Sequence, residues 1–313
     1  MNESDIDGAF SAARHRPYTG RMYARQPLST AVNHLATPRL SLTSCVRGVM
    51  VRNTAGAHLS PAQRLNYFPA TPLCHIGWLF NGRSEWVDGP FPVSPDGPTR
   101  PIPKGVLFGG PRERPCVSLN PGPVHGMMLL LMPDAVRLLT GIDPAQWLDS
   151  FTDVREVLPP DWVAMCDSVQ HAADDATRIR LIEDFLDPRW SAARPATPMN
   201  AGRYLDWAQG LAMRAAMSAP GRSLRQTERR IKQWAGQPMR ELLGVGRAER
   251  AFFAALTADR AGHVDWAGIA ADEGYADQSH LCRAVRRITG FSPEALRLRI
   301  AEDEAFWAYR MWQ

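Results

Sequence analysis

The sequence predicts an α+β protein with a mostly β amino-terminal domain, a helical connector and an all-α carboxy-terminal domain. In residues 18–132, short apolar runs alternate with turns rich in proline and glycine, a pattern typical of strands. After Pro133 the composition favours helices. The chain has 313 residues, of which 45% are hydrophobic, so it is long enough for two domains with cores of their own.

The β region contains apolar runs at residues 75–80, 104–108 and 126–132. Six prolines between residues 88 and 104 are too dense for a helix or a central strand, so this segment is predicted to be a loop or an edge.

The predicted connector consists of helices near residues 134–140, 161–173 and 177–186, each with Asp or Thr near its start. Residues 189–200 contain Pro195 and Pro198 among small residues and are predicted to be the linker. The predicted domains are therefore residues 1–190 and 200–313.

The charge distribution, the cysteines and the lack of long apolar runs indicate the kind of partner and the cell compartment. From Ala196 onward there are 17 basic and 13 acidic residues, which accounts for the whole net charge of +4 and hints at an acidic partner. The five cysteines are widely spaced and odd in number, so reduced thiols are expected. No apolar run is long enough for a membrane span or a secretory signal, which predicts a cytoplasmic protein.

The sharpest pattern lies in residues 267–297, AGIAADEGYADQSHLCRAVRRITGFSPEALR. Gly274 suits a turn with positive φ, and Asp277 is positioned to cap the following helix. Gly290 and Pro293 then end that helix. This order predicts a helix, a short turn and a second helix.

The second of these helices has an apolar and a basic face. Its apolar stripe is Leu281, Ala284, Val285 and Ile288. Its exposed residues are predicted to be Gln278, Ser279, Arg283, Arg286 and Arg287. Such a face fits the major groove of DNA, where arginine can bind guanine and its neighbours can hold phosphates. The alternative is a solvated helix face without a ligand, which is common for basic helices.

This segment resembles the signature of the AraC/XylS family of transcription regulators. The matching positions are Ile269, Ala270, Gly274, Tyr275, Asp277, Ser279, His280, Arg283, Arg286, Arg287, Gly290, Ser292 and Pro293. Leu281, Val285 and Leu296 replace aromatic residues of the signature but remain apolar. The resemblance implies a regulator that binds specific double-stranded DNA through two helix-turn-helix units. It also implies a cupin-like amino-terminal domain that binds a small effector or forms a homodimer.

Residues 221–242, GRSLRQTERRIKQWAGQPMREL, resemble the other unit. Gly221 and Ser223 match its turn, and Gly236 and Pro238 match its closing turn. The predicted inner stripe is Leu224, Thr227, Ile231 and Trp234. Pro220 is a departure, since it falls where the preceding helix should run.

Arg225, Arg229 and Lys232 are predicted to point outward from this helix. The resemblance implies that Arg225, Glu228 and Arg229 read bases. Glu228 could accept from cytosine or pair with Lys232 four residues later. Between the two units, residues 239–256 are predicted to form one helix of about 27 Å.

The amino-terminal half offers no chemical motif of its own. His34, His58, His75 and His125 are solitary, so neither a metal nor another cofactor is expected. Four aromatic side chains could line a pocket or fill a core: Trp78, Phe80, Trp86 and Phe108.

Two alternatives remain to the regulator. A DNA-modifying or repair enzyme with a helix-turn-helix tail would need a reactive group, for which an activated Cys45, Cys74 or Cys116 is the simplest source. An interaction protein would use the β domain only to dimerise.

Overall fold

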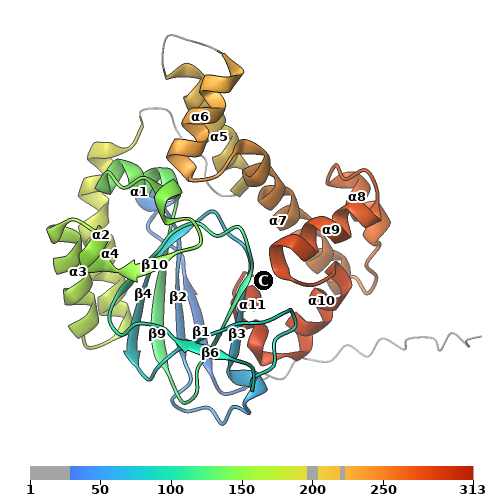
Figure 1. Ribbon diagram of the computed structural model, residues 1–313, viewed down its shortest axis with the longest axis horizontal. Coiled ribbons are helices and arrows are strands. Elements are labelled where there is room, and N and C mark those ends of the chain that lie inside the picture. The colour runs from blue at the N-terminus through green and yellow to red at the C-terminus, as the bar shows by residue number, and fades with distance from the viewer. Residues whose placement is uncertain (1–28, 196–203, 219–222, 313) are drawn as a thin grey trace, which may run out of the picture.

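The computed structural model describes residues 29–195, 204–218 and 223–312. It has a sheet-rich amino-terminal part and a helical carboxy-terminal part, which confirms the predicted α+β class (Figure 1). Gly221 and Pro220, which the sequence placed in the first turn, lie outside the described residues.

The larger sheet has the strand order β1-β2-β9-β4-β7-β10, and all its neighbouring strands are antiparallel. Its strands are β1 (Val32–Ala36), β2 (Val46–Asn53), β4 (Cys74–Asn81), β7 (Leu107–Gly109), β9 (His125–Leu131) and β10 (Phe151–Asp153). The apolar runs at residues 75–80 and 126–132 therefore correspond to β4 and β9, and the run at 104–108 overlaps the short strand β7.

The smaller sheet has the order β3-β8-β5-β6. Its strands are β3 (Leu65–Phe68), β8 (Cys116–Leu119), β5 (Glu85–Val87) and β6 (Thr99–Pro101). The proline-rich segment contributes the fully exposed edge strand β6, as its prolines predict, because proline cannot donate to a neighbouring strand.

The connector is helical, as expected, and two of its helices lie together beside the larger sheet (Figure 1). Its helices are α1 (Pro133–Thr140), α2 (Val154–Val157), α3 (Pro160–His171) and α4 (Asp175–Ala193). The predicted linker start at residue 189 is wrong, because α4 continues through Pro188 to Ala193. Trp190 explains this: it is buried, and its Nε1 donates to Ser44 Oγ at 3.0 Å, which holds the last turn in place.

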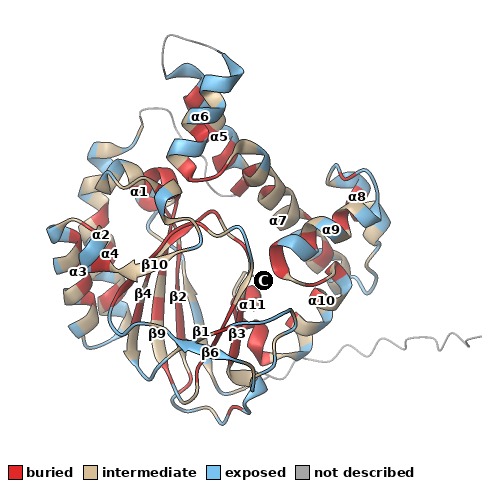
Figure 2. Ribbon diagram, viewed as in Figure 1, coloured by how far each residue is buried: buried red, intermediate tan, exposed pale blue. Residues whose placement is uncertain are grey.

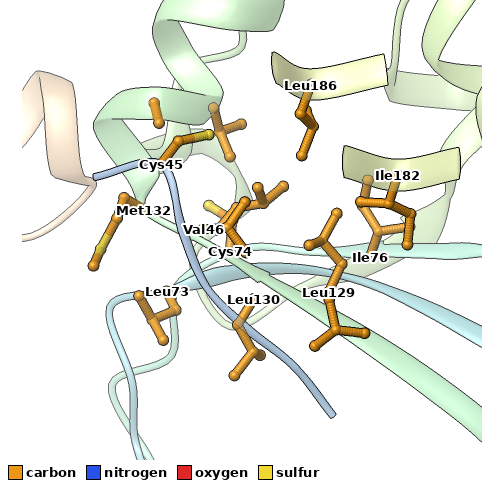
Figure 3. Packing of buried hydrophobic residues seen from close by; sticks show 14 of the residues in the cluster. Cys45, Val46, Leu73, Cys74, Ile76, Leu129, Leu130, Met132, Ile182 and Leu186 are labelled. Atoms are coloured by element: carbon orange, nitrogen blue, oxygen red, sulfur yellow. The ribbon is translucent and has the colours of Figure 1, made fainter. Parts of the chain in front are cut away.

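The main core lies between the larger sheet and the connector helices. Ile76 and Leu129 project from the sheet towards Ile182 and Leu186 of α4, and all four are buried (Figure 3). Alternate residues of the strands thus form an apolar face of the larger sheet, and this face packs against the apolar side of α4.

The carboxy-terminal part consists of α5 (Tyr204–Met217), α6 (Leu224–Ala235), α7 (Met239–Arg260), α8 (Trp266–Asp272), α9 (Gln278–Thr289), α10 (Pro293–Glu302) and α11 (Trp307–Arg310). Short 3-10 helices are η1 (Leu40–Leu42), η2 (Ala62–Arg64), η3 (Pro144–Trp147) and η4 (Glu304–Phe306). α7 runs between the pair α5–α6 and the group α8–α10 (Figure 1).

Hydrophobic packing crosses the predicted domain boundary. The main core includes Trp207 and Leu211 of α5, whose side chains are fully buried. A second cluster combines strands of the smaller sheet with α9, α10 and η4. At its centre the ring of Tyr67 stacks on that of Phe306, with centroids 4.5 Å apart. Figure 2 shows the resulting continuity, with buried residues on strands and on helices of both parts.

A buried ion pair joins the two parts of the chain at η4. Arg52 of β2 donates to Glu304 Oε1 at 2.9 Å, and the two side chains are only 6% and 2% exposed. The guanidinium of Arg52 also lies over the ring of Trp307. The indole of Trp307 donates to Asn66 Oδ1 at 2.8 Å. Such a desolvated pair needs both partners, because a lone buried charge is strongly unfavourable.

We therefore expect Glu304→Ala to lower the free energy of unfolding by about 3–5 kcal/mol, since it leaves the Arg52 cation buried without its carboxylate. Chemical denaturation of the full chain measures this. The exposed Glu302→Ala is the matched control and should change stability by less than about 0.5 kcal/mol. Equal effects of the two substitutions would show that the pair does not join the two parts.

Candidate nucleic-acid interface and interdomain cavity

The helix pair α8–α9 has the predicted turn. Gly274 has a φ of +73°, which glycine adopts without strain. Asp277 caps α9 by accepting from the backbone N–H of His280 at 2.6 Å. Gly290, with a φ of +84°, ends the helix. Local signals alone therefore determine both ends of α9.

The two faces of α9 are also as predicted. Leu281, Val285 and Ile288 are at most 7% exposed, and the replacement of aromatic residues by Leu281, Val285 and Leu296 leaves those positions buried. The predicted outward residues are all exposed: Gln278, Ser279, Arg283, Arg286 and Arg287. This surface presents three arginines on one helix.

The helix pair α5–α6 forms the other unit. Ser223 caps α6 by accepting from Gln226 N–H at 3.3 Å, and Gly236 ends it with a φ of +77°. Ile231 is buried as predicted. The prediction for Leu224 is wrong, because its side chain is 89% exposed. Leu224 is the first residue of α6, where the described part of the chain provides no apolar neighbour to cover it.

Arg225, Arg229 and Lys232 of α6 are exposed, as predicted, and Glu228 is exposed as well. The upper part of α6 is correspondingly coloured as exposed in Figure 2. Glu228 has a further contact that the sequence did not suggest. Its carboxylate accepts from the backbone N–H of Met239, at the start of α7, at 3.0 Å. A carboxylate there stabilises α7 through its free N–H groups and its dipole.

The spacer helix α7 is longer than predicted. It has 22 residues rather than 18 and so spans about 33 Å. It is fastened to the second unit by ion pairs, from Arg250 to Glu273 at 2.6 Å and from Arg287 to Glu241 at 2.5 Å. These contacts hold the second unit against the first half and the middle of α7, and α6 meets the start of the same helix through Glu228.

Each unit also rests on the amino-terminal part. On the first unit, Trp207 Nε1 donates to Asp134 of α1 at 2.8 Å, and Arg214 pairs with the same carboxylate. On the second, the Ile288 carbonyl accepts from Ala70 N–H at 2.8 Å. The amino-terminal part therefore holds α5 and α9 directly, and Ile231 of α6 packs into the same main core, whereas the predicted outward basic residues of α6 and α9 are exposed.

A cavity of about 270 Å³ lies where the two parts meet. Its amino-terminal walls come from segments around residues 68–75, 112–116 and 128–130, and its carboxy-terminal walls from α7, α9 and α10. The lining is mainly apolar. Of the four aromatic residues proposed from the sequence, Trp86 lines this cavity, whereas Trp78 and Phe108 are core residues. No sequence signal indicated the cavity, because its walls come from distant segments.

His75 and Arg112 lie at one side of the cavity. The guanidinium of Arg112 is 5.2 Å from the ring centroid of Phe151, which in turn contacts His75 at 5.2 Å between ring centroids. Burial, together with the Arg112 cation, lowers the pKa of His75 to about 4. His75 is therefore neutral at pH 7.

The cysteines do not have the environment of reactive thiols. Burial raises the pKa of Cys116 to about 11 and raises the pKa values of Cys45 and Cys74 further. These three thiols stay protonated at neutral pH. They do not supply the thiolate that the enzyme alternative requires.

Within the described residues, no cluster of three or more histidine, cysteine or acidic side chains has the arrangement of a metal site. None of their helices is long and apolar enough to cross a membrane.

Known structures similar to this chain include those of ToxT from Vibrio cholerae. An apo form is 12% identical, covers 79% of this chain and 95% of its own, and has a TM-score of 0.38. A form with bound unsaturated fatty acid is 12% identical, covers 74% and 93%, and has a TM-score of 0.30. No protein-family profile and no curated protein matches the sequence.

The low pKa of His75 gives a testable pH dependence. The unfolded chain takes up this proton near the ordinary pKa of 6.5, whereas the folded chain takes it up only near 4. The free energy of unfolding should therefore decrease as pH falls through that window. We expect His75→Gln to flatten this part of the stability curve, measured by denaturation from pH 7 to 4.5. The exposed His34→Gln is the control, and an unchanged slope in His75→Gln would contradict the assignment.

Proposed function

We propose that this protein is a sequence-specific, DNA-binding transcription regulator of the AraC type, responsive to a small-molecule effector. The observation that carries the proposal is the pair of capped helices, α6 and α9, which have basic exposed faces and both contact the long helix α7. The resemblance of residues 267–297, which include α9, to the family signature supports it as well.

We infer that the two basic helices contact one duplex together. Successive major-groove openings on one face of B-DNA are about 34 Å apart, and α7, which joins the two units in the chain, is about 33 Å long. On this proposal α6 reads one groove segment with Arg225 and Arg229, and α9 reads the next with Gln278 and Arg283. Arg287, which pairs with Glu241, would bind phosphate with Arg286 and Lys232.

The effector would occupy the cavity between the two parts. A ligand changes DNA affinity only if it binds the two conformations of the protein differently, and such coupling is typically about 1–3 kcal/mol. Val285 and Ile288 of α9 line the cavity, so a ligand there would touch the second reading helix from behind. We further propose that the protein works in the cytoplasm as a homodimer formed through its amino-terminal, cupin-like part.

The decisive experiment is selection of binding sites from random duplexes by the full-length protein, followed by gel-shift titration. Affinity should fall steeply with salt, because arginine contacts release counterions from phosphates. If selection enriched no sequence, the proposal would be lost.

On a selected site, Arg229→Ala and Arg283→Ala should each weaken binding by about 1–3 kcal/mol and relax preference at different base positions. Arg287→Ala should weaken binding without changing preference. Arg83→Ala, an exposed arginine of the amino-terminal part, is the control. If Arg229→Ala and Arg283→Ala lost as much affinity for random DNA as for the selected site, both arginines would contact phosphates and not bases.

A further inference from the structure

The acidic groups that line the interdomain cavity already have cationic partners. Glu249 accepts from Arg47 at 2.8 Å and from the backbone N–H of Tyr204 at 3.3 Å. Asp259 pairs with Arg297 at 2.6 Å. Neither carboxylate is therefore an open site for a cationic ligand.

Arg112 differs from these residues. Within the described part of the chain, no carboxylate pairs with its guanidinium, and its buried Nε–H has no hydrogen-bond partner. The guanidinium lies instead beside two aromatic rings, 5.2 Å from the ring centroid of Phe151 and 5.8 Å from that of Trp86. Ring faces attract a cation, but they do not satisfy its N–H donors, and a buried N–H group without a partner is costly.

The remaining unused polar groups of the cavity can also donate. Tyr204 and Tyr309 both line it, and both hydroxyls are buried without a hydrogen-bond partner. His75 adds no second cation, because its pKa is lowered to about 4. The cavity thus combines apolar walls with one unpaired cation and free donors.

We propose that this cavity binds an apolar organic molecule with a single carboxylate, which pairs with Arg112. The planar fork of arginine matches the two oxygens of a carboxylate, and one unpaired cation matches one negative charge. The apolar body would pack against Phe68, Leu130 and Phe252 and against Ile288 of α9. The role of this ligand as an effector of DNA binding rests on the proposed function. Its binding to the cavity does not depend on that function.

The test uses the full-length protein without DNA. The probes are decanoate, 4-phenylbutyrate and 2-naphthoate, each compared with its uncharged amide, and binding is measured by calorimetry and by thermal shift. We expect at least one carboxylate to bind about tenfold or more tightly than its amide, since a charge-assisted pair is worth at least that factor.

Arg112→Met removes the charge and should abolish the preference for the carboxylate. Arg112→Lys keeps the positive charge but loses the planar guanidinium, so it should retain part of the preference for the carboxylate over the amide. Arg114→Met, an exposed arginine two residues away, should bind like the unmodified chain. If Arg112→Met does not fold, the comparison of acid with amide on the unmodified protein still decides.

The proposal is overturned if no carboxylate of the set binds, if the amides bind equally well, or if Arg112→Met keeps the preference. Its failure is distinct from that of the proposed function. Site selection and gel shifts without any ligand test DNA binding alone, whereas the calorimetry contains no DNA.

Discussion

The two helix-turn-helix units need apolar partners for their inner faces, and the amino-terminal part supplies many of them. Trp207 and Ile231 of the first unit belong to the core of the larger sheet, whereas Phe291 and Phe306 belong to a cluster with Tyr67 of the smaller sheet. Burial of such side chains is worth about 1.5–3 kcal/mol each. The positions of both basic helices therefore depend on these interfaces as much as on their own turns.

Polar contacts give this packing its orientation. Asp134 accepts from Trp207 and pairs with Arg214, while Glu304 pairs with Arg52 and Arg310. Hydrophobic burial has no direction, but a buried carboxylate tolerates few arrangements because an unpaired charge is expensive. The two carboxylates therefore define how the first unit meets α1 and how the carboxy-terminal end meets β2.

The sequence predicted those features that local chemistry determines. In each unit the capping residue and the glycine that ends the helix are 13 positions apart, Ser223 and Gly236 in α6 and Asp277 and Gly290 in α9. The apolar stripe of α9 lies between the second pair. The features that the sequence did not predict depend on tertiary packing between distant segments.

Three particular cases show this. Trp190 holds α4 together beyond Pro188 through contacts made far along the chain. Leu224 fits an apolar stripe but finds no surface to cover it in the described structure. Arg112 lies in a turn segment without any motif, and its place in a cavity wall follows only from the meeting of the two parts. The cavity is lined by residues of α7 and by the inner face of α9, so a group that fills it contacts both helices. Because Val285 and Ile288 of α9 are both part of the core and part of this wall, the packing of the cavity and the position of α9 depend on the same side chains.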